Sequence, residues 1–185
     1  MRRMLVLVAM FGLLAACELP TSTPMSNGVA IKDSGDLTIA PGSLGPAKAG
    51  MTKREALDTG LFSQQKFDPS EKCKASALKW KKQYKNVEVH TDAAGTIRSL
   101  RVVGPGAKTQ FGTQVGSDLA DVRGSYSSAL HGPSKRDRIH SVGFVQKGDA
   151  WMGFLFEDDP DDEVLDPIAM IELTKGTKPQ LRRTC

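Results

Sequence analysis

A phrase that occurs twice constrains the fold of this chain more than any other feature. Gly50-Met51-Thr52 and Gly116-Ser117-Asp118 lie 66 residues apart, and each is followed three residues later by an acid and by apolar residues at helical spacing. A Thr or Asp followed at this distance by a carboxylate is typical of a capped helix start. A period this long favours two copies of one α+β unit over a solenoid. The alternative is a chance similarity between two capped helices.

Each phrase is followed by runs in which apolar and polar residues alternate, as in half-buried strands. The first set is 77–80, 87–91 and 96–103, and the second is 139–146, 150–156 and 168–173. Asp92-Ala93-Ala94-Gly95 and Lys147-Gly148-Asp149 predict hairpin turns. We therefore expect an α+β fold of two tandem units, residues 29–105 and 106–185, each a short helix followed by an antiparallel sheet with one buried face. A small hairpin is expected within Val29 to Ala40.

The N-terminus predicts where the protein resides. Arg2 and Arg3 precede the apolar run Met4 to Ala16, which is too short to span a bilayer and suits a signal peptide. Leu14-Ala15-Ala16-Cys17 resembles the lipobox of bacterial lipoproteins. That resemblance implies cleavage after residue 16, diacylglycerol on the Cys17 thiol and often a further acyl chain on its new amino group. Two chains hold a protein stably on a membrane, whereas one holds it marginally. The alternative is an ordinary signal peptide with a chance cysteine.

The residues after Cys17 complete this expectation. Residues 18–28 are rich in Pro, Ser and Thr and predict a flexible tether, so 17–28 is the lipidated cysteine with its tether. We expect an extracytoplasmic protein anchored to the cell membrane or the outer membrane. Without Arg2 and Arg3, 23 basic residues face 21 acidic ones, and this near-neutral balance gives no support for nucleic-acid binding.

Two cysteines remain once Cys17 is lipidated, Cys73 and Cys185. In an oxidising compartment an even pair predicts a disulfide. By loop-entropy arguments it would contribute up to about 4–5 kcal/mol. A redox or nucleophilic cysteine is the alternative, although the sequence has no CxxC motif to support it.

The stretch Leu44 to Ala56, its echo at Gly116-Ser117-Asp118 and the glycine-turned hairpin together resemble a group of secreted bacterial domains. The group includes the β-lactamase inhibitory protein and the outer-membrane assembly lipoproteins of the BamE (SmpA/OmlA) type. The resemblance covers roughly residues 37–173 and implies a tandem helix-plus-sheet fold. In the inhibitory protein an acidic hairpin tip plugs the target enzyme, and Asp92 lies on a corresponding hairpin here. The residues that flank it do not match, so β-lactamase inhibition is not expected.

Catalytic and cofactor motifs are missing from the sequence. His90, His131 and His140 stand at no metal-ligand spacing, and there is no nucleophile elbow, phosphate loop or dinucleotide fingerprint. We expect no enzyme activity, metal or cofactor. The rival hypothesis is a small envelope enzyme with a cleft between the two halves, which clustering of His90, His140 and an acid would favour. The acidic loop 157–163 lacks the spacing of a dedicated calcium loop, so a solvated loop is favoured over a cation site.

The expected function is therefore that of a macromolecule-binding module whose partner is an envelope protein or polymer, with an envelope-assembly factor as another alternative. A lysine-rich stretch surrounds two aromatic residues between positions 66 and 85 and could face anionic lipid or an acidic polymer. A solvated strand face with inward aromatics is the plainer interpretation. The candidate binding residues are Asp92, Trp80, Tyr84, Lys81 and Lys82.

Overall fold

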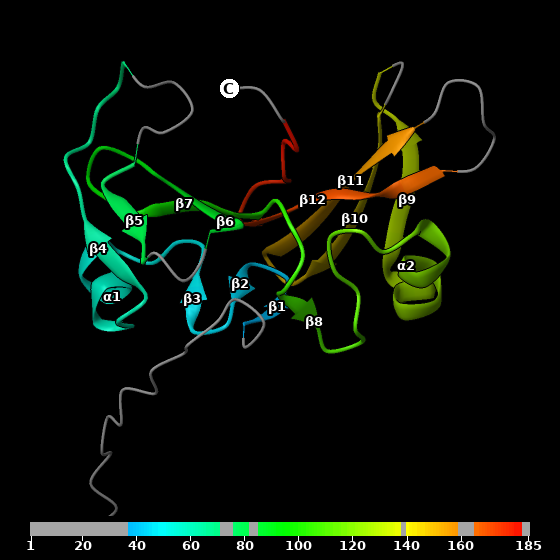
Figure 1. Cartoon of the computed structure of the whole chain (residues 1–185), viewed down its shortest axis with the longest axis horizontal. Coiled ribbons are helices and arrows are strands. Elements are labelled where there is room, and N and C mark those ends of the chain that lie inside the picture. The colour runs from blue at the N-terminus through cyan, green and yellow to red at the C-terminus, as the bar shows by residue number, and fades with distance from the viewer. Residues whose placement is uncertain (1–36, 71–75, 82–84, 138–139, 159–164, 183–185) are drawn as a thin grey trace, which may run out of the picture.

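The computed structural model describes residues 37–70, 76–81, 85–137, 140–158 and 165–182. Strands dominate these residues and two α-helices accompany them, so the fold is α+β with mostly β structure (Figure 1). Among the described residues, no helix has the length and apolar character needed to cross a bilayer. The predicted signal peptide and tether lie outside the described residues, as do Cys17, Cys73, Cys185 and the loop 159–164.

The largest sheet has six strands in the order β6-β7-β12-β11-β10-β9. Its strands are β6 (Val87–Thr91), β7 (Ile97–Val102), β9 (Leu130–Lys135), β10 (His140–Lys147), β11 (Ala150–Asp158) and β12 (Leu165–Lys175). All neighbours are antiparallel, and β7 pairs with β12 along Val102↔Ile171 to Ser99↔Thr174. The prediction of a separate sheet in each half is therefore wrong. The backbone N–H and C=O groups on the facing edges of β7 and β12 form hydrogen bonds with each other, so the two halves share one sheet.

Two smaller sheets flank the large one. One has the order β3-β2-β1-β8, with β1 (Thr38–Ala40), β2 (Ser43–Leu44), β3 (Ala47–Lys48) and β8 (Lys108–Thr109). Strand β1 runs parallel to β8 and so ties the start of the described chain to its middle. The other sheet pairs β4 (Phe62–Gln64) with β5 (Leu78–Trp80). Strand β5 lies beside β6, where the Ala77 N–H donates to the Thr91 hydroxyl at 2.7 Å.

Both predicted helices form at their predicted caps. In α1 (Lys53–Asp58) the Thr52 hydroxyl accepts from the Glu55 N–H while the Glu55 carboxylate accepts from the Thr52 N–H, which is a complete capping box. In α2 (Leu119–Tyr126) the Asp118 side chain accepts from the Asp121 N–H, and the short 3-10 helix η2 (Ser127–Ala129) follows.

The residues before each helix attach it to the sheet in the same way. The Gly50 N–H donates to the Ile97 carbonyl and the Ile97 N–H donates to Met51, both at 2.8 Å. The Gly116 N–H donates to the Ile168 carbonyl and the Ile168 N–H donates to Ser117, both at 2.9 Å. Gly50 and Gly116 have φ of 89° and 94°, a left-handed conformation that glycine adopts without steric cost.

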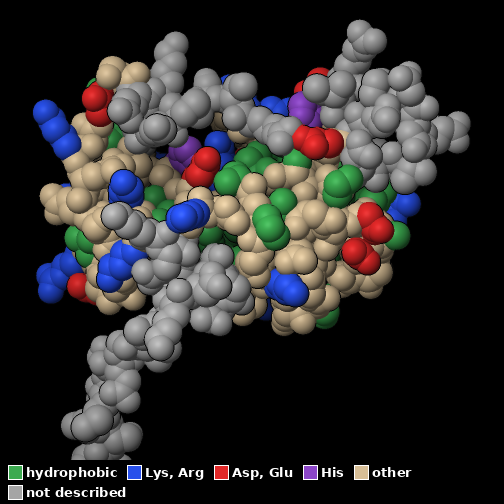
Figure 2. All heavy atoms as spheres, viewed as in Figure 1, with side chains coloured by type: hydrophobic (Ala, Val, Ile, Leu, Met, Phe, Trp, Pro, Cys, Tyr) green, Lys and Arg blue, Asp and Glu red, His purple; other side chains and the backbone are tan. Residues whose placement is uncertain are grey.

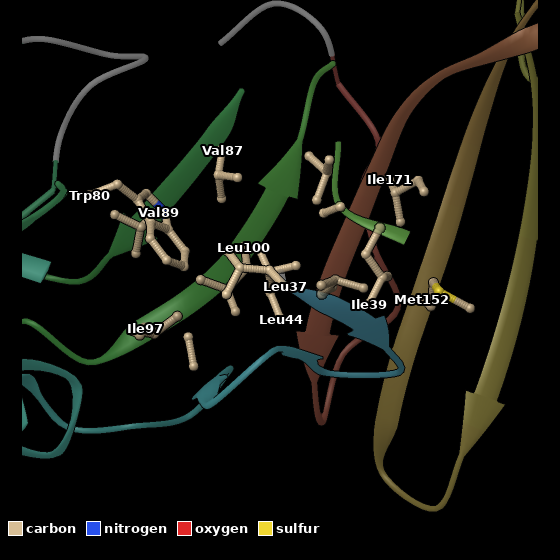
Figure 3. Packing of buried hydrophobic residues seen from close by; sticks show 14 of the residues in the cluster. Leu37, Ile39, Leu44, Trp80, Val87, Val89, Ile97, Leu100, Met152 and Ile171 are labelled. Atoms are coloured by element: carbon tan, nitrogen blue, oxygen red, sulfur yellow. The ribbon is translucent and has the colours of Figure 1, made fainter. Parts of the chain in front are cut away.

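The main core lies on one face of the large sheet and draws on both halves of the chain. Figure 3 shows Leu37, which directly precedes β1, and Leu44 of β2 near Leu100 of β7. Ile39 of β1 and Ile171 of β12 belong to the same core. The helices add Ala56, Leu119 and Val122 to this core. Helices and the β1–β3 strands therefore cover this face together, whereas the sequence predicted helices alone.

The opposite face of the sheet, here called the second face, is partly covered by the C-terminal segment Gly176 to Leu181. Leu181 packs among Val142, Phe144, Leu155 and Met170 in a smaller core, with Trp151 against it. Gly153 of β11 leaves room for this segment, because a Cβ there would lie 2.9 Å from the Pro179 side chain.

The described residues also test the predicted hairpins and strands. The hairpins 87–102 and 140–158 form with the predicted turns. The predicted 29–40 hairpin is described only from residue 37, where β1 pairs with β2 and β8 instead. Strands β4 and β9 were not predicted, because Phe62–Gln64 is too short and Leu130–Lys135 contains Gly132 and Pro133.

Candidate functional site

The second face carries a row of polar side chains where the two halves of the chain meet. Alternation along β6, β7 and β12 directs Leu100 and Leu173 into the main core and leaves Glu88, Arg101 and Glu172 for the second face. These three residues are direct cross-strand neighbours, since Arg101 pairs with Glu88 on one side and with Glu172 on the other. His90 and Ser99 form the next pair along β6 and β7. We call these five residues the polar patch.

The centre of the polar patch is a buried ion pair. Arg101 Nε lies 2.9 Å from Glu172 Oε1, and the two side chains are 13% and 3% exposed. The other carboxylate oxygen of Glu172 accepts the Leu181 N–H at 2.6 Å. Both oxygens therefore have a donor, as a charge removed from water requires. The Arg136 guanidinium also donates to the Leu181 carbonyl, so the C-terminal segment is held by its backbone as well as by its side chain.

The outer edge of the polar patch is accessible. Glu88 is 49% exposed and its Oε2 lies 3.4 Å from His90 Nε2, with the His90 side chain 20% exposed. The hydrogen bond from His90 lowers the pKa of Glu88, desolvation opposes this, and the nearby charge of Arg101 lowers the pKa further. The carboxylate of Glu88 is therefore ionised at neutral pH and about half exposed to solvent.

Asp92 lies at the β6–β7 hairpin, as predicted, and its carboxylate is used by that hairpin. One oxygen accepts the Thr96 N–H at 2.9 Å, and the other lies 2.9 Å from the Arg98 guanidinium. The backbone hydrogen bond from Thr96 is the main reason why the pKa of Asp92 is lowered, with Arg98 contributing. This geometry is that of an aspartate that stabilises its own turn.

The other candidate binding residues do not gather on one surface in the described part of the chain. Trp80 is 6% exposed and packs in the main core, with its ring 4.3 Å from the Phe62 ring. Lys81 is exposed, and its N–H donates to the Leu61 carbonyl at 3.1 Å. Tyr84 and Lys82 lie outside the described residues. The alternation of exposed Lys79 with buried Leu78 and Trp80 matches the interpretation of a solvated face with inward aromatics.

The two strand histidines lie far apart. His90 is on β6 and His140 is on β10, with β7, β12 and β11 between them, which corresponds to about 19 Å at the usual strand spacing. His140 has its own acid, because its Nδ1 lies 2.9 Å from Asp137 Oδ1. The clustering that would favour a catalytic cleft is therefore not found among the described residues. Nor do these residues contain a group of three or more side chains suited to hold a metal ion.

The sequence patterns do not single out Arg101, Glu172 or Leu181. Arg101 follows the alternation of β7, so its position on the polar side of the strand could be derived from the pattern. Its partner Glu172 could not, because a single acid inside the apolar run 168–173 gives no sign of which strand will lie beside it. Comparison with family models, with curated proteins and with solved structures finds no match to this chain.

Proposed function

We propose that this protein is an extracytoplasmic lipoprotein, anchored to a bacterial membrane through Cys17, that binds another envelope macromolecule through the polar patch without catalysing a reaction. The observation that supports the binding role is that one part of the second face is covered and another part is accessible. The β10–β12 part of this face is partly covered by the C-terminal segment, while Glu88 and His90 stay accessible beside it. The main-core face is occupied by the packing of the helices and of strands β1 and β2.

The anchor rests on the sequence. A charged start, an apolar run of signal-peptide length and a small-residue stretch before Cys17 are what export and lipidation require. The domain described from residue 37 onward would then be held near the bilayer by the 18–36 segment. In this location Cys73 and Cys185 would form a disulfide. Mass spectrometry of the non-reduced protein should contain the Cys73–Cys185 peptide, and two free thiols would contradict the pairing.

The proposal also includes the tandem architecture, with units 29–105 and 106–185. Three regularities support it. The glycines before α1 and α2 make matching bonds to Ile97 and Ile168. The β6–β7 and β11–β12 pairs each have a register shift next to those isoleucines. The third regularity is the symmetry of the β7–β12 pairing. If β7 is aligned with β12 so that Ile97 matches Ile168, Arg101 matches Glu172, and exchanging the two strands gives the same register.

The polar patch suits a macromolecular partner for a physical reason. Its groups lie on neighbouring strands of one sheet, so donors on a second surface can align with the accessible ones without entering a cavity. Glu88 is ionised and half exposed, so a partner can reach it without first breaking the buried Arg101–Glu172 pair. A cationic or hydrogen-bond-donating surface would complement Glu88, whereas the guanidinium of Arg101 is already engaged.

The test places a photo-crosslinking amino acid at Glu88 and, in a second variant, at Lys135. Lys135 is exposed at the end of β9 and serves as the control. After irradiation in native envelopes, the proposal predicts a discrete adduct from position 88 that is absent from position 135. Glu88→Gln in the unlabelled protein should compete less well than the wild type for that adduct. No adduct at position 88, or the same adducts from both positions, would overturn the proposed surface.

A further inference from the structure

We infer that the turn Gln110-Phe111-Gly112 is a second membrane contact, which inserts the Phe111 ring into the phospholipid bilayer to which Cys17 tethers the domain. This inference rests on the proposed function, since it requires the lipid anchor. It concerns a surface other than the polar patch. The turn follows β8, the strand that lies next to β1 where the described chain begins.

Phe111 is an unusual residue on this surface. Among the described residues only Phe111 and Val103 are large hydrophobic side chains that are exposed, and Phe111 is the more exposed at 55%. Gln110 and Gly112 on either side are exposed as well. The ring therefore lies in an exposed turn, with one side against Tyr126, a partly buried residue that packs on the main core.

The turn is closed at its base by hydrogen bonds. The Thr109 N–H donates to the Thr113 carbonyl at 2.8 Å, and the Gly112 N–H donates back to the Thr109 carbonyl at 2.9 Å. Thr109 and Thr113 are 5% and 2% exposed, and the Thr113 hydroxyl donates to the Ser125 hydroxyl of α2. The Phe111 ring meets the Tyr126 ring edge to face at 5.4 Å. The Phe111 ring is thus fixed on one side by Tyr126 while the rest of it is exposed, so little conformational entropy is lost when the exposed part meets a bilayer.

The position of the turn relative to the anchor argues for a bilayer as the occupant. Thr38, the first residue of β1, pairs with Lys108, two residues from the turn. Figure 1 places β1, β8 and the turn after β8 along the lower edge of the molecule, with the C-terminal segment at the opposite edge. The predicted tether, residues 18–28, would have a root-mean-square span of about 18 Å. The lower edge therefore stays within reach of the membrane that holds Cys17.

A single exposed aromatic residue is weak on its own, and single exposed apolar residues are common. The tether changes this balance, because contact with the bilayer becomes an intramolecular step at high effective concentration. Lys108 is exposed beside the turn and can extend its ammonium group to the headgroups. The first turn of α2 carries the exposed acids Asp118 and Asp121, so net charge does not draw this region to anionic lipid. Insertion of the Phe111 ring, and not electrostatic attraction, is therefore what stabilises the contact with the bilayer.

Depth-dependent fluorescence quenching tests the inference. The mature lipidated protein, as wild type, Phe111→Trp and Lys135→Trp, is reconstituted into vesicles of phosphatidylcholine and phosphatidylglycerol with either normal or brominated acyl chains. The wild type supplies the background of Trp80 and Trp151. The emission added by Phe111→Trp should be blue-shifted and lost in brominated vesicles, whereas that of Lys135→Trp should be unaffected.

Equal quenching at both positions, or none at position 111, would overturn the inference. The result should hold in vesicles of phosphatidylcholine alone, since charge is not the driving force. Phe111→Ser provides a second reading: on vesicles, amide hydrogen exchange of residues 109–113 should be slower in the wild type than in this variant. The lipid anchor is tested separately by the release of Cys17→Ser from membranes, so anchor and turn can fail independently.

Discussion

Replacement of Arg101 by Met should destabilise the protein far more than the same replacement at Arg98. Both arginines pair with a carboxylate at 2.9 Å, but Arg101 is 13% exposed and Arg98 is 70% exposed. Arg101→Met leaves Glu172, which is 3% exposed, as a buried charge that still accepts the Leu181 N–H. Removal of one partner of a buried pair costs about 3–5 kcal/mol, and we expect about 3 because the Leu181 bond remains.

The Arg98→Met variant is the control, because it removes an exposed ion pair of the same length. A surface ion pair contributes about 0–1 kcal/mol, so its loss should be close to neutral. For a chain of this length about 3 kcal/mol corresponds to a fall in Tm of roughly 6–12 °C. Urea unfolding followed by circular dichroism measures both variants. The double variant Arg101→Met/Glu172→Gln should regain part of the loss, because the neutral amide still accepts the Leu181 N–H and no charge stays buried. An Arg101→Met variant within about 0.5 kcal/mol of the wild type would refute this account of the polar patch.

Two further predictions concern the C-terminal segment and the β6–β7 hairpin. Leu181→Ala should cost about 2–4 kcal/mol in the free energy of unfolding, because it empties the centre of the smaller core; a urea midpoint equal to that of the wild type would contradict this. Asp92→Asn should lower Tm at neutral pH, since the pKa of Asp92 is lowered in the folded state by the Thr96 N–H and by Arg98. A lowered pKa gives stability that is present above the ordinary value of 3.8 and is lost as the pH falls through the folded-state pKa. The Tm difference between wild type and variant should therefore close in acid, and a difference that widens there would contradict the assignment.

Local features of this fold could be predicted from the sequence, and long-range pairing could not. Thr52 and Asp118 cap their helices because capping depends on residues within one turn. The hairpin closed by Asp92 to Gly95 formed for the same reason. The union of β7 with β12 depends instead on two segments about 70 residues apart, and neither carries a signal that selects the other.

The candidate site follows the same division. The inward position of Trp80 agrees with the alternation of β5, which a short-range pattern reveals. The polar patch depends on the β7–β12 register, because Arg101 and Glu172 become a pair only through it. Leu181 gave no signal, since it packs through a segment without strand or helix periodicity. Strand β9 forms despite Gly132 and Pro133 because β10 offers an open edge, and tertiary pairing there outweighs local propensity.

The membrane anchor is the central claim, because the proposed binding role and the proposed Phe111 contact both depend on it. Its most direct test is the fractionation of the wild type and Cys17→Ser from bacteria that process lipoproteins. The account predicts that the wild type sediments with membranes and carries acyl chains on the peptide that begins at Cys17. Cys17→Ser should be released as an unacylated, folded protein. A Cys17→Ser variant that stays in the membrane fraction, or a wild type without acyl chains on Cys17, would contradict it.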